Sequence, residues 1–216
     1  MGDAPCSPCA GLGEVSRDLD LRIVAANEAS CEDLAAVFGT SGGAARCLCQ
    51  RFKTPGMDFE LQIHPVEERA FRLREQTDCG YPDAETTRGL VGYLDDEPVG
   101  WCAVEPRNEL QNLGRTPWVR RSEDKDDETV WAATCFITRA GFRGQGVSRA
   151  MTRATVGFAH ERGARALEGY PMITQPGVEI TWGELHVGSR IAFADAGFIE
   201  VSRPSLRRVV MRIDFD

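Results

Sequence analysis

The clearest pattern along the chain is a continuous run of apolar residues over positions 130–137. A run of this length without polar breaks is typical of a strand that is buried on both faces. A shorter run over 166–170 has the same pattern, whereas residues 18–26 alternate between apolar and charged positions. The alternation predicts a strand with one solvated face, which suits the edge of a sheet.

Helical periodicity and capping residues predict helices in the intervals between these strands. Apolar residues at helical spacing predict a helix that opens at 143–148, runs to about 162 and is ended by Gly163. A proline in the first turn, early acids and late arginines predict a helix over 65–76. Ser30 is a suitable N-cap for a helix through 38, and a short helix is expected over 189–196.

The remaining strands are expected in pairs. Residues 87–93 and 98–104 flank Asp95-Asp96 and predict a β-hairpin, and two more strands are expected over 199–202 and 206–215. After the central strand, a helix is expected to cross over the sheet and lead into a strand parallel to the central one. This order predicts an α/β (α+β) fold with a mixed, mostly antiparallel sheet flanked by helices. We expect one domain over 18–216 and a disordered tail over 1–17.

The turn between the central strand and the long helix has the composition of an anion site. Residues 143–148 read Arg-Gly-Gln-Gly-Val-Ser, and Arg149 and Arg153 follow. Glycines let the backbone approach a ligand, and the first N–H groups of a helix have no partners within it. A P-loop would need a Lys that is absent, and a dinucleotide turn would need Gly at Arg149, although Glu168 stands about 20 residues further on. The turn can also be explained as a simple helix start.

This turn resembles the pyrophosphate loop of the GNAT N-acetyltransferases, Arg/Gln-x-x-Gly-x-Gly/Ala, with Ser148 at the last position. Three other places share the resemblance: Pro-Val-Gly-Trp over 98–101, the strand before the loop, and the segment 191–198 that ends in Ala-Gly-Phe. The resemblance extends over roughly 19–213. It implies the GNAT fold and disfavours a nicotinamide-dependent oxidoreductase, the weaker interpretation that rests on Glu168.

The resemblance implies acetyl-CoA as co-substrate and a primary amine as acceptor. The pantetheine arm is expected to pair with Phe136, Ile137 and Thr138, where a backbone N–H would polarise the thioester carbonyl. The pyrophosphate is expected at the loop and the first helical turn, namely at Arg143, Gly144, Gln145, Gly146, Val147, Ser148 and Arg149.

The chain departs from the family at the residue that is expected to donate a proton. Many members have a Tyr acid where this chain has Phe193, so another residue or water would supply the proton, or catalysis would be poor. His186 is the best substitute, since its ordinary pKa suits proton transfer. The alternative explanation is that it caps the last helix or lies in a loop. Candidates for the general base are Glu128, Glu105 and Glu184.

The acceptor site is expected from Tyr81, Trp182 and Glu184. Aromatic walls with acids suit a small cationic or amphipathic molecule. The main hypothesis is therefore N-acetylation of a small-molecule amine. The alternatives are a protein or peptide amine, and a non-catalytic acyl-CoA-binding module, which Phe193 favours.

Composition and the N-terminal sequence limit the partners and the cellular location that are expected. The net charge of −8 argues against nucleic acid as a partner, and no apolar run reaches the length of a membrane span. The N-terminus has no secretory pattern, so a cytoplasmic protein is expected. A homodimer is an expectation from the resemblance alone, because sheet-edge dimers are common in that family.

The eight cysteines are expected to be reduced thiols. Cys6 and Cys9 together with Cys47 and Cys49 are the one arrangement that suggests zinc. Its Cys-x-Cys spacing is unusual for that metal, so no metal site is expected.

Overall fold

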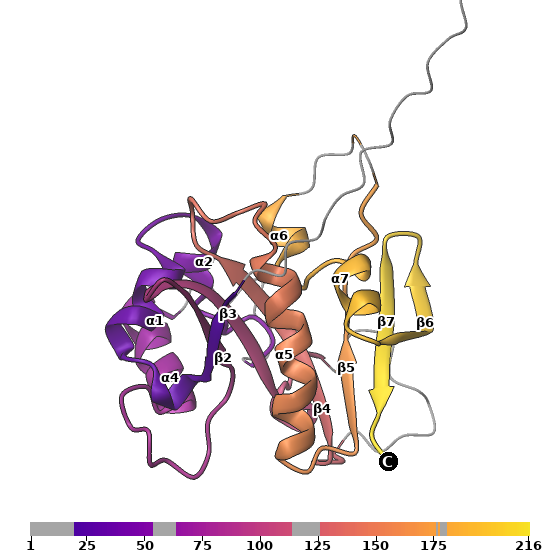
Figure 1. Cartoon of the computed structure of the whole chain (residues 1–216), viewed down its shortest axis with the longest axis horizontal. Coiled ribbons are helices and arrows are strands. Elements are labelled where there is room, and N and C mark those ends of the chain that lie inside the picture. The colour runs from indigo at the N-terminus through magenta and orange to yellow at the C-terminus, as the bar shows by residue number, and fades with distance from the viewer. Residues whose placement is uncertain (1–19, 54–63, 114–125, 176, 178–180) are drawn as a thin grey trace, which may run out of the picture.

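The computed structural model describes residues 20–53, 64–113, 126–175, 177 and 181–216 (Figure 1). The expected tail over 1–17, with Cys6 and Cys9, lies outside the described residues. The strands form one seven-stranded sheet in the order β1-β2-β3-β4-β5-β7-β6. Only β4 and β5 pair in parallel, and the other neighbours are antiparallel. The predicted mixed sheet and its parallel pair are therefore confirmed.

The strand bounds follow the hydrophobic pattern closely, and β1 lies at a sheet edge as its alternation predicts. The tight turn between β2 and β3 places Asp95 and Asp96 at φ of 49° and 65°, a conformation that short polar residues tolerate. The strands are β1 Arg22–Ala25, β2 Leu90–Leu94, β3 Glu97–Pro106, β4 Val130–Thr138, β5 Ala166–Gly169, β6 Ile199–Ser205 and β7 Arg208–Asp214.

Helices cover the two faces of this sheet. The long helix α5 packs against β2, β3, β4 and β5, and α7 packs beside it on β7, whereas α1 lies against β3 and β4 on the opposite face. No described helix is long and apolar enough to cross a membrane. The helices are α1 Cys31–Phe38, α2 Gly42–Cys47, α4 Val66–Thr77, α5 Val147–Glu161, α6 Trp182–Leu185 and α7 Arg190–Asp195, with 3-10 turns at Ala26–Glu28 and Arg107–Glu109.

Alternation along β3 and β4 divides the core between these faces. Cys102, Ala133 and Phe136 pack with the residues of α5, whereas Trp101 and Ile137 pack with those of α1. Because successive side chains of a strand point to opposite faces, the nearly unbroken apolar run of β4 serves two cores at once. The run therefore signals a central strand, as predicted.

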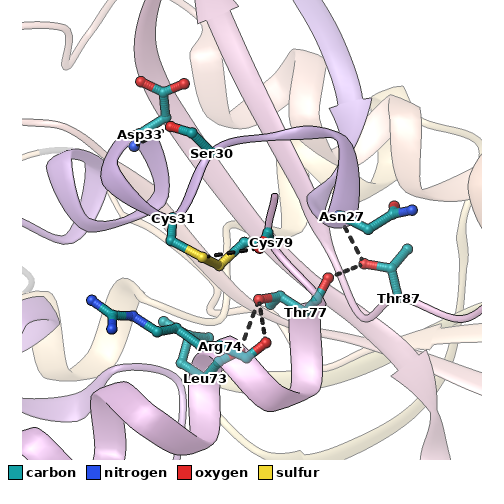
Figure 2. Close-up of a disulfide and its surroundings, with 9 residues drawn as sticks. All are labelled: Asn27, Ser30, Cys31, Asp33, Leu73, Arg74, Thr77, Cys79 and Thr87. Carbon is teal, nitrogen blue, oxygen red and sulfur yellow. Dashed lines mark hydrogen bonds between the residues drawn. A yellow bond between two sulfur atoms is a disulfide. The ribbon is translucent and has the colours of Figure 1, made fainter. Parts of the chain in front are cut away.

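One expectation about the cysteines was wrong. Cys31, at the start of α1, and Cys79, just after α4, form a disulfide, as Figure 2 shows. The two residues are 48 positions apart, but their Cα atoms lie 5.1 Å from each other, within the range that a disulfide spans. Cys47, Cys49, Cys102 and Cys135 are buried free thiols.

The segment after β3 also differs from expectation. Residues 108–127 look like a polar surface loop, but the described part begins with a 3-10 turn, and Leu110 and Leu113 are buried against Tyr170 and Val210. The burial of these two leucines stabilises the packing of residues 107–113 against the sheet. Residues 114–125 lie outside the described part.

Candidate functional site

The site is built around a free edge of β4. This strand pairs with β3 from Trp131 to Thr138 but with β5 only from Val130 to Ala133. Residues 134–138 therefore have no β5 neighbour where the two strands diverge, and we call this stretch the open edge. An extended ligand can add to such an edge as if it were another strand.

Backbone hydrogen bonds show to which side each residue of the open edge directs its N–H group. The N–H of Phe136 donates to the carbonyl of His186 at 2.6 Å, and the N–H of Arg139 donates to Val99 on β3 at 2.8 Å. Because neighbouring residues of a strand direct their N–H groups to opposite sides, Thr138 shares the open side with Phe136, and Ile137 faces β3. Of the three residues expected to bind pantetheine, Phe136 and Thr138 thus have backbone groups on the open side.

The loop after β4 supplies glycines that the fold itself does not crowd. Gly141, Gly144 and Gly146 have φ of 95°, 76° and 91°, and a Cβ added at any of them would meet no atom within 4 Å. The left-handed backbone explains why glycine stands there. The empty space beside the loop is what a phosphate needs in order to approach the backbone.

The N–H groups of this loop are also available. Within the described part of the chain, none of residues 143–148 donates its N–H to a backbone carbonyl, and the ladder of α5 begins when Arg149 and Ala150 donate to Gly146. The first turn of α5 contains no acid. Arg143 is exposed, and Arg149 lies 3.6 Å from Asp195. The helix dipole, the N–H groups and the arginines together favour an anion here.

Two glycines that sequence reasoning missed fix the position of this loop. A Cβ at Gly100 would come 2.9 Å from Val147, and one at Gly92 would come 2.7 Å from Met151. The start of α5 can therefore press directly on β2 and β3, which holds the loop at the end of β4. The signal in the sequence was a glycine in each strand of the predicted hairpin.

His186 and Phe193 both contact Phe136 of the open edge, the first through its backbone carbonyl and the second through its ring. The imidazole is buried, with 3% exposure, and stacks on Phe52 with ring centroids 5.9 Å apart. Phe193 is fully buried and packs edge-on against Phe136 and Phe198. The position that holds a tyrosine acid in many GNAT proteins is here part of the core.

Two of the three expected base residues, Glu105 and Glu128, lie farther away along the strands. Glu105 is buried, pairs in register with Ala132 and forms a salt bridge of 2.9 Å with Lys53. Four residues of strand separate Ala132 from Phe136, about 13 Å at 3.3 Å per residue. Glu128 is exposed and precedes β4, at the end opposite the loop. The structure does not bring either carboxylate to the open edge.

The expected acceptor residues are separated as well. Glu184 lies in α6 and pairs with Arg207 at 2.8 Å, and its pKa is lowered, first by the N–H of Thr181. Trp182 begins α6, but its side chain lies outside the described part. Tyr81 is 71% exposed in the connection between α4 and β2, next to the β1–β2 edge of the sheet. Tyr81 therefore lies apart from the divergence of β4 and β5.

Arginines are the functional candidates that sequence reasoning missed near α6. The guanidinium of Arg51 donates to the carbonyl of Gly183 at 3.3 Å. Arg208 is half-buried, and its pKa is lowered first by burial, while Glu184 acts in the opposite direction. The consecutive arginines at 207 and 208 were visible in the sequence, but their meeting with residue 51 depends on the fold.

Glu168 has a structural role that removes the nicotinamide interpretation. Its carboxylate is buried between Arg212 at 2.7 Å and Arg107 at 3.3 Å, and it accepts a hydrogen bond from Tyr170 at 2.8 Å. Burial first, and then Glu168, raise the pKa of Tyr170. An acid enclosed in this way cannot bind a ribose, and the largely antiparallel sheet is not a dinucleotide fold.

Comparison with known proteins agrees with this geometry. The family model described as "Acetyltransferase (GNAT) family" matches residues 56–170, just over half of the chain. No curated protein matches the chain by sequence.

Solved structures show the same fold. An N-acetyltransferase from Staphylococcus aureus Mu50 is 12% identical, with a TM-score of 0.51 over 90% of this chain and 98% of that one. A second solved acetyltransferase is 17% identical, with a TM-score of 0.50 over 90% of this chain and 100% of that one. At such identities the likeness concerns the fold alone.

Proposed function

Because the chain belongs to the GNAT acetyltransferase family, we propose that it transfers an acetyl group from acetyl-CoA to the primary amine of a small molecule. The observation that carries the proposal is the β4–α5 loop. Its N–H groups over 143–148 have no backbone acceptor in the described part of the chain, and its glycines border empty space. A diphosphate fits both features, since it brings negative charge and needs close approach to the backbone.

The donor would occupy the loop and the open edge together. The diphosphate would accept from the N–H groups of 143–148, with Arg143 and Arg149 adding charge at the rim. The pantetheine arm would pair with the backbone of Phe136 and Thr138, while Ile137 supports it by packing in the core below.

The N–H of Phe136 is our candidate for polarising the thioester carbonyl. Its present acceptor is a neutral carbonyl, that of His186, so a thioester oxygen would replace it with an acceptor of the same kind. A fixed N–H aimed at the oxygen that gains charge stabilises the transition state without reorganisation.

The acceptor must arrive as a free amine, because an ammonium has no lone pair. Its nitrogen would form the new bond to the acetyl carbon as the bond to sulfur breaks, and the sulfur and the new amide nitrogen would exchange a proton with the site. We propose His186 for this exchange because its backbone carbonyl bonds to Phe136 in the open edge. Glu105 and Glu128 are weaker candidates, given their positions along the strands.

A non-catalytic acyl-CoA-binding protein is the second candidate, favoured by the fully buried Phe193. The pH dependence of turnover discriminates between the two. If His186 moves the proton, the rate will show a titrating limb that disappears in His186→Gln. If the protein only binds, neither form will release CoA faster than the uncatalysed mixture.

Titration calorimetry with acetyl-CoA tests the proposal directly, with NAD as a competitor. We expect acetyl-CoA to bind, NAD to leave the isotherm unchanged, and free thiol to appear when amines are added. Failure to bind acetyl-CoA would refute the proposal.

A further inference from the structure

The charges near α6 indicate what the acceptor carries besides its amine. Three segments that are far apart in sequence meet there: residues 51–52 after α2, residues 183–189 around α6, and residues 207–208 at the start of β7. Arg51 binds the carbonyl of Gly183, and Arg207 binds Glu184. Figure 1 shows α6 and the β6–β7 turn at the same end of the molecule.

A short chain of backbone contacts connects Arg208 to the open edge. Met172 bridges to Arg208 and donates its N–H to the carbonyl of Gly188 at 3.0 Å. Gly188 follows His186 by two residues, and the carbonyl of His186 accepts from Phe136. Arg208 is thus linked, through the backbone of Met172 and Gly188, to the segment that borders the open edge.

Arg208 also points to the correct side of the sheet. Val209 and Met211 pack in the core beneath α5, whereas Val210 packs with Leu110 and Tyr170 on the other side. Because side chains alternate along a strand, Arg208 shares the face of Val210. This face, away from α5, is the one on which Arg51 and Phe52 approach His186.

Among the described residues, the guanidinium of Arg208 has no direct partner for its charge. Within the part of the chain that the structure describes, its guanidinium has no hydrogen bond or ion pair, and the nearby carboxylate of Glu184 is engaged by Arg207. Arg51 and Arg207 are its other electrostatic neighbours. Among the described residues that act electrostatically on Arg208, the arginines at 51 and 207 oppose its charge and Glu184 favours it. A half-buried cation of this kind is stabilised by an anion that brings two oxygens.

Building on the proposed function, we propose that the acceptor is an amine that also bears a carboxylate, as an amino acid does, and that Arg208 binds this carboxylate. Arg51 adds to the positive field, and the amine then faces the open edge of β4. Of the cationic and amphipathic acceptors expected from composition, an amphipathic one suits these charges better, because Glu184 already pairs with Arg207. It also assigns a specificity role to the β6–β7 hairpin.

Matched sets of acceptors test the proposal: L-amino acids, their primary amides and the corresponding decarboxylated amines. Turnover of each set is measured by release of free CoA thiol for wild type, Arg208→Gln and Arg203→Gln. Arg203 lies on the same hairpin and is already paired with Glu200, so Arg203→Gln is the control. We expect wild type to prefer the acids, and Arg208→Gln to raise their KM about tenfold or more, the effect of losing a charged hydrogen bond. The amides and amines should be unaffected.

A binding measurement accompanies the kinetics. With CoA present, the acids should raise the melting temperature of wild type and not of Arg208→Gln. The affinity for acetyl-CoA should be equal in both forms, because a loss in Arg208→Gln would show that the anion belongs to the donor and overturn the proposal. Equal use of acids and amides by wild type, or no stabilisation by any acid, would also overturn it. If acetyl-CoA itself fails to bind wild type, it is the proposed function that falls.

Discussion

Two connections of this fold differ in whether their backbone N–H groups find an acceptor among the described residues. Residues 78–89, between α4 and β2, and residues 139–146, between β4 and α5, each contain a left-handed glycine beside empty space, Gly80 in the first and Gly146 in the second. In the α4–β2 connection, Gly80 donates its N–H to the carbonyl of Ala29 at 2.8 Å. In the β4–α5 loop, the N–H groups of 143–148 have no backbone acceptor among the described residues.

Side chains extend this contrast. The buried amide of Asn27 donates to the carbonyls of Tyr81, Pro82 and Ala84 at 3.1–3.4 Å. The hydroxyl of Thr87 accepts from Asn27 N–H and donates to the carbonyl of Thr77, next to the disulfide in Figure 2. A loop whose polar groups are satisfied within the fold serves stability. A loop whose exposed N–H groups have no acceptor in the described part of the fold can offer them to an anionic ligand.

The largest effect is expected from the disulfide. Replacing both Cys31 and Cys79 by Ser should lower the free energy of unfolding by on the order of 3–4 kcal/mol, because the crosslink closes a loop of 48 residues in the unfolded chain. Denaturant unfolding measures the loss, and a phosphine reductant should lower the stability of wild type but not of the double variant. Below the unfolding transition, acetyl-CoA affinity should be unchanged. If the affinity for acetyl-CoA fell together with the stability, the two connections would not have separate roles.

The matched glycines give the next largest effect. Gly146→Val should weaken acetyl-CoA binding about a hundredfold, roughly 2.7 kcal/mol, because the side chain fills the space of the diphosphate and strains the loop. Gly80→Val introduces the same left-handed strain, so both variants should lose a similar 1–3 kcal/mol of stability. Calorimetry with acetyl-CoA should separate them. Equal affinities would mean that the β4–α5 loop does not hold the donor.

The sequence was informative where structure follows from local pattern. The unbroken run of β4, the alternation of β1 and the glycines before α5 each act within about ten residues, so the fold and the glycine turn before α5 could be predicted. The disulfide could not, because Cys31 and Cys79 become neighbours only when α1 and α4 pack. For the same reason the meeting of Arg51 with Arg208 was missed.

Ion pairing is the feature of the candidate acids that the sequence could not show. Glu184 and Glu105 are candidate bases, and in the structure they form ion pairs with Arg207 and Lys53. A sequence shows that a carboxylate exists, and only the fold shows which cation lies beside it.

A smaller effect is expected at Asn27, which fastens the α4–β2 connection without a covalent bond. Asn27→Ala should cost about 2 kcal/mol of stability, since carbonyls near its amide lose their donor. Asn27→Asp should cost more, because a carboxylate would face those carbonyls. Urea unfolding measures both variants, and acetyl-CoA affinity should remain that of wild type. If Asn27→Asp proved as stable as wild type, the amide would not be the fastening group.

The smallest effect concerns Tyr93, which ties β2 to α1 by donating to Asp33 at 3.0 Å. Burial first, and then Asp33, raise the pKa of Tyr93 to about 12. The folded state thus favours the neutral phenol, so this contribution is complete below the unfolded pKa near 10 and is lost as the pH rises from about 10 to 12. Tyr93→Phe should cost about 1 kcal/mol at pH 7, and the stabilities of the two proteins should converge across that range. Tyr81→Phe, on the exposed side of the α4–β2 connection, should match wild type throughout. A constant gap between wild type and Tyr93→Phe up to pH 12 would show that the phenol contributes by packing alone, and the α1 side would then be held by the disulfide and Asn27 without this bond.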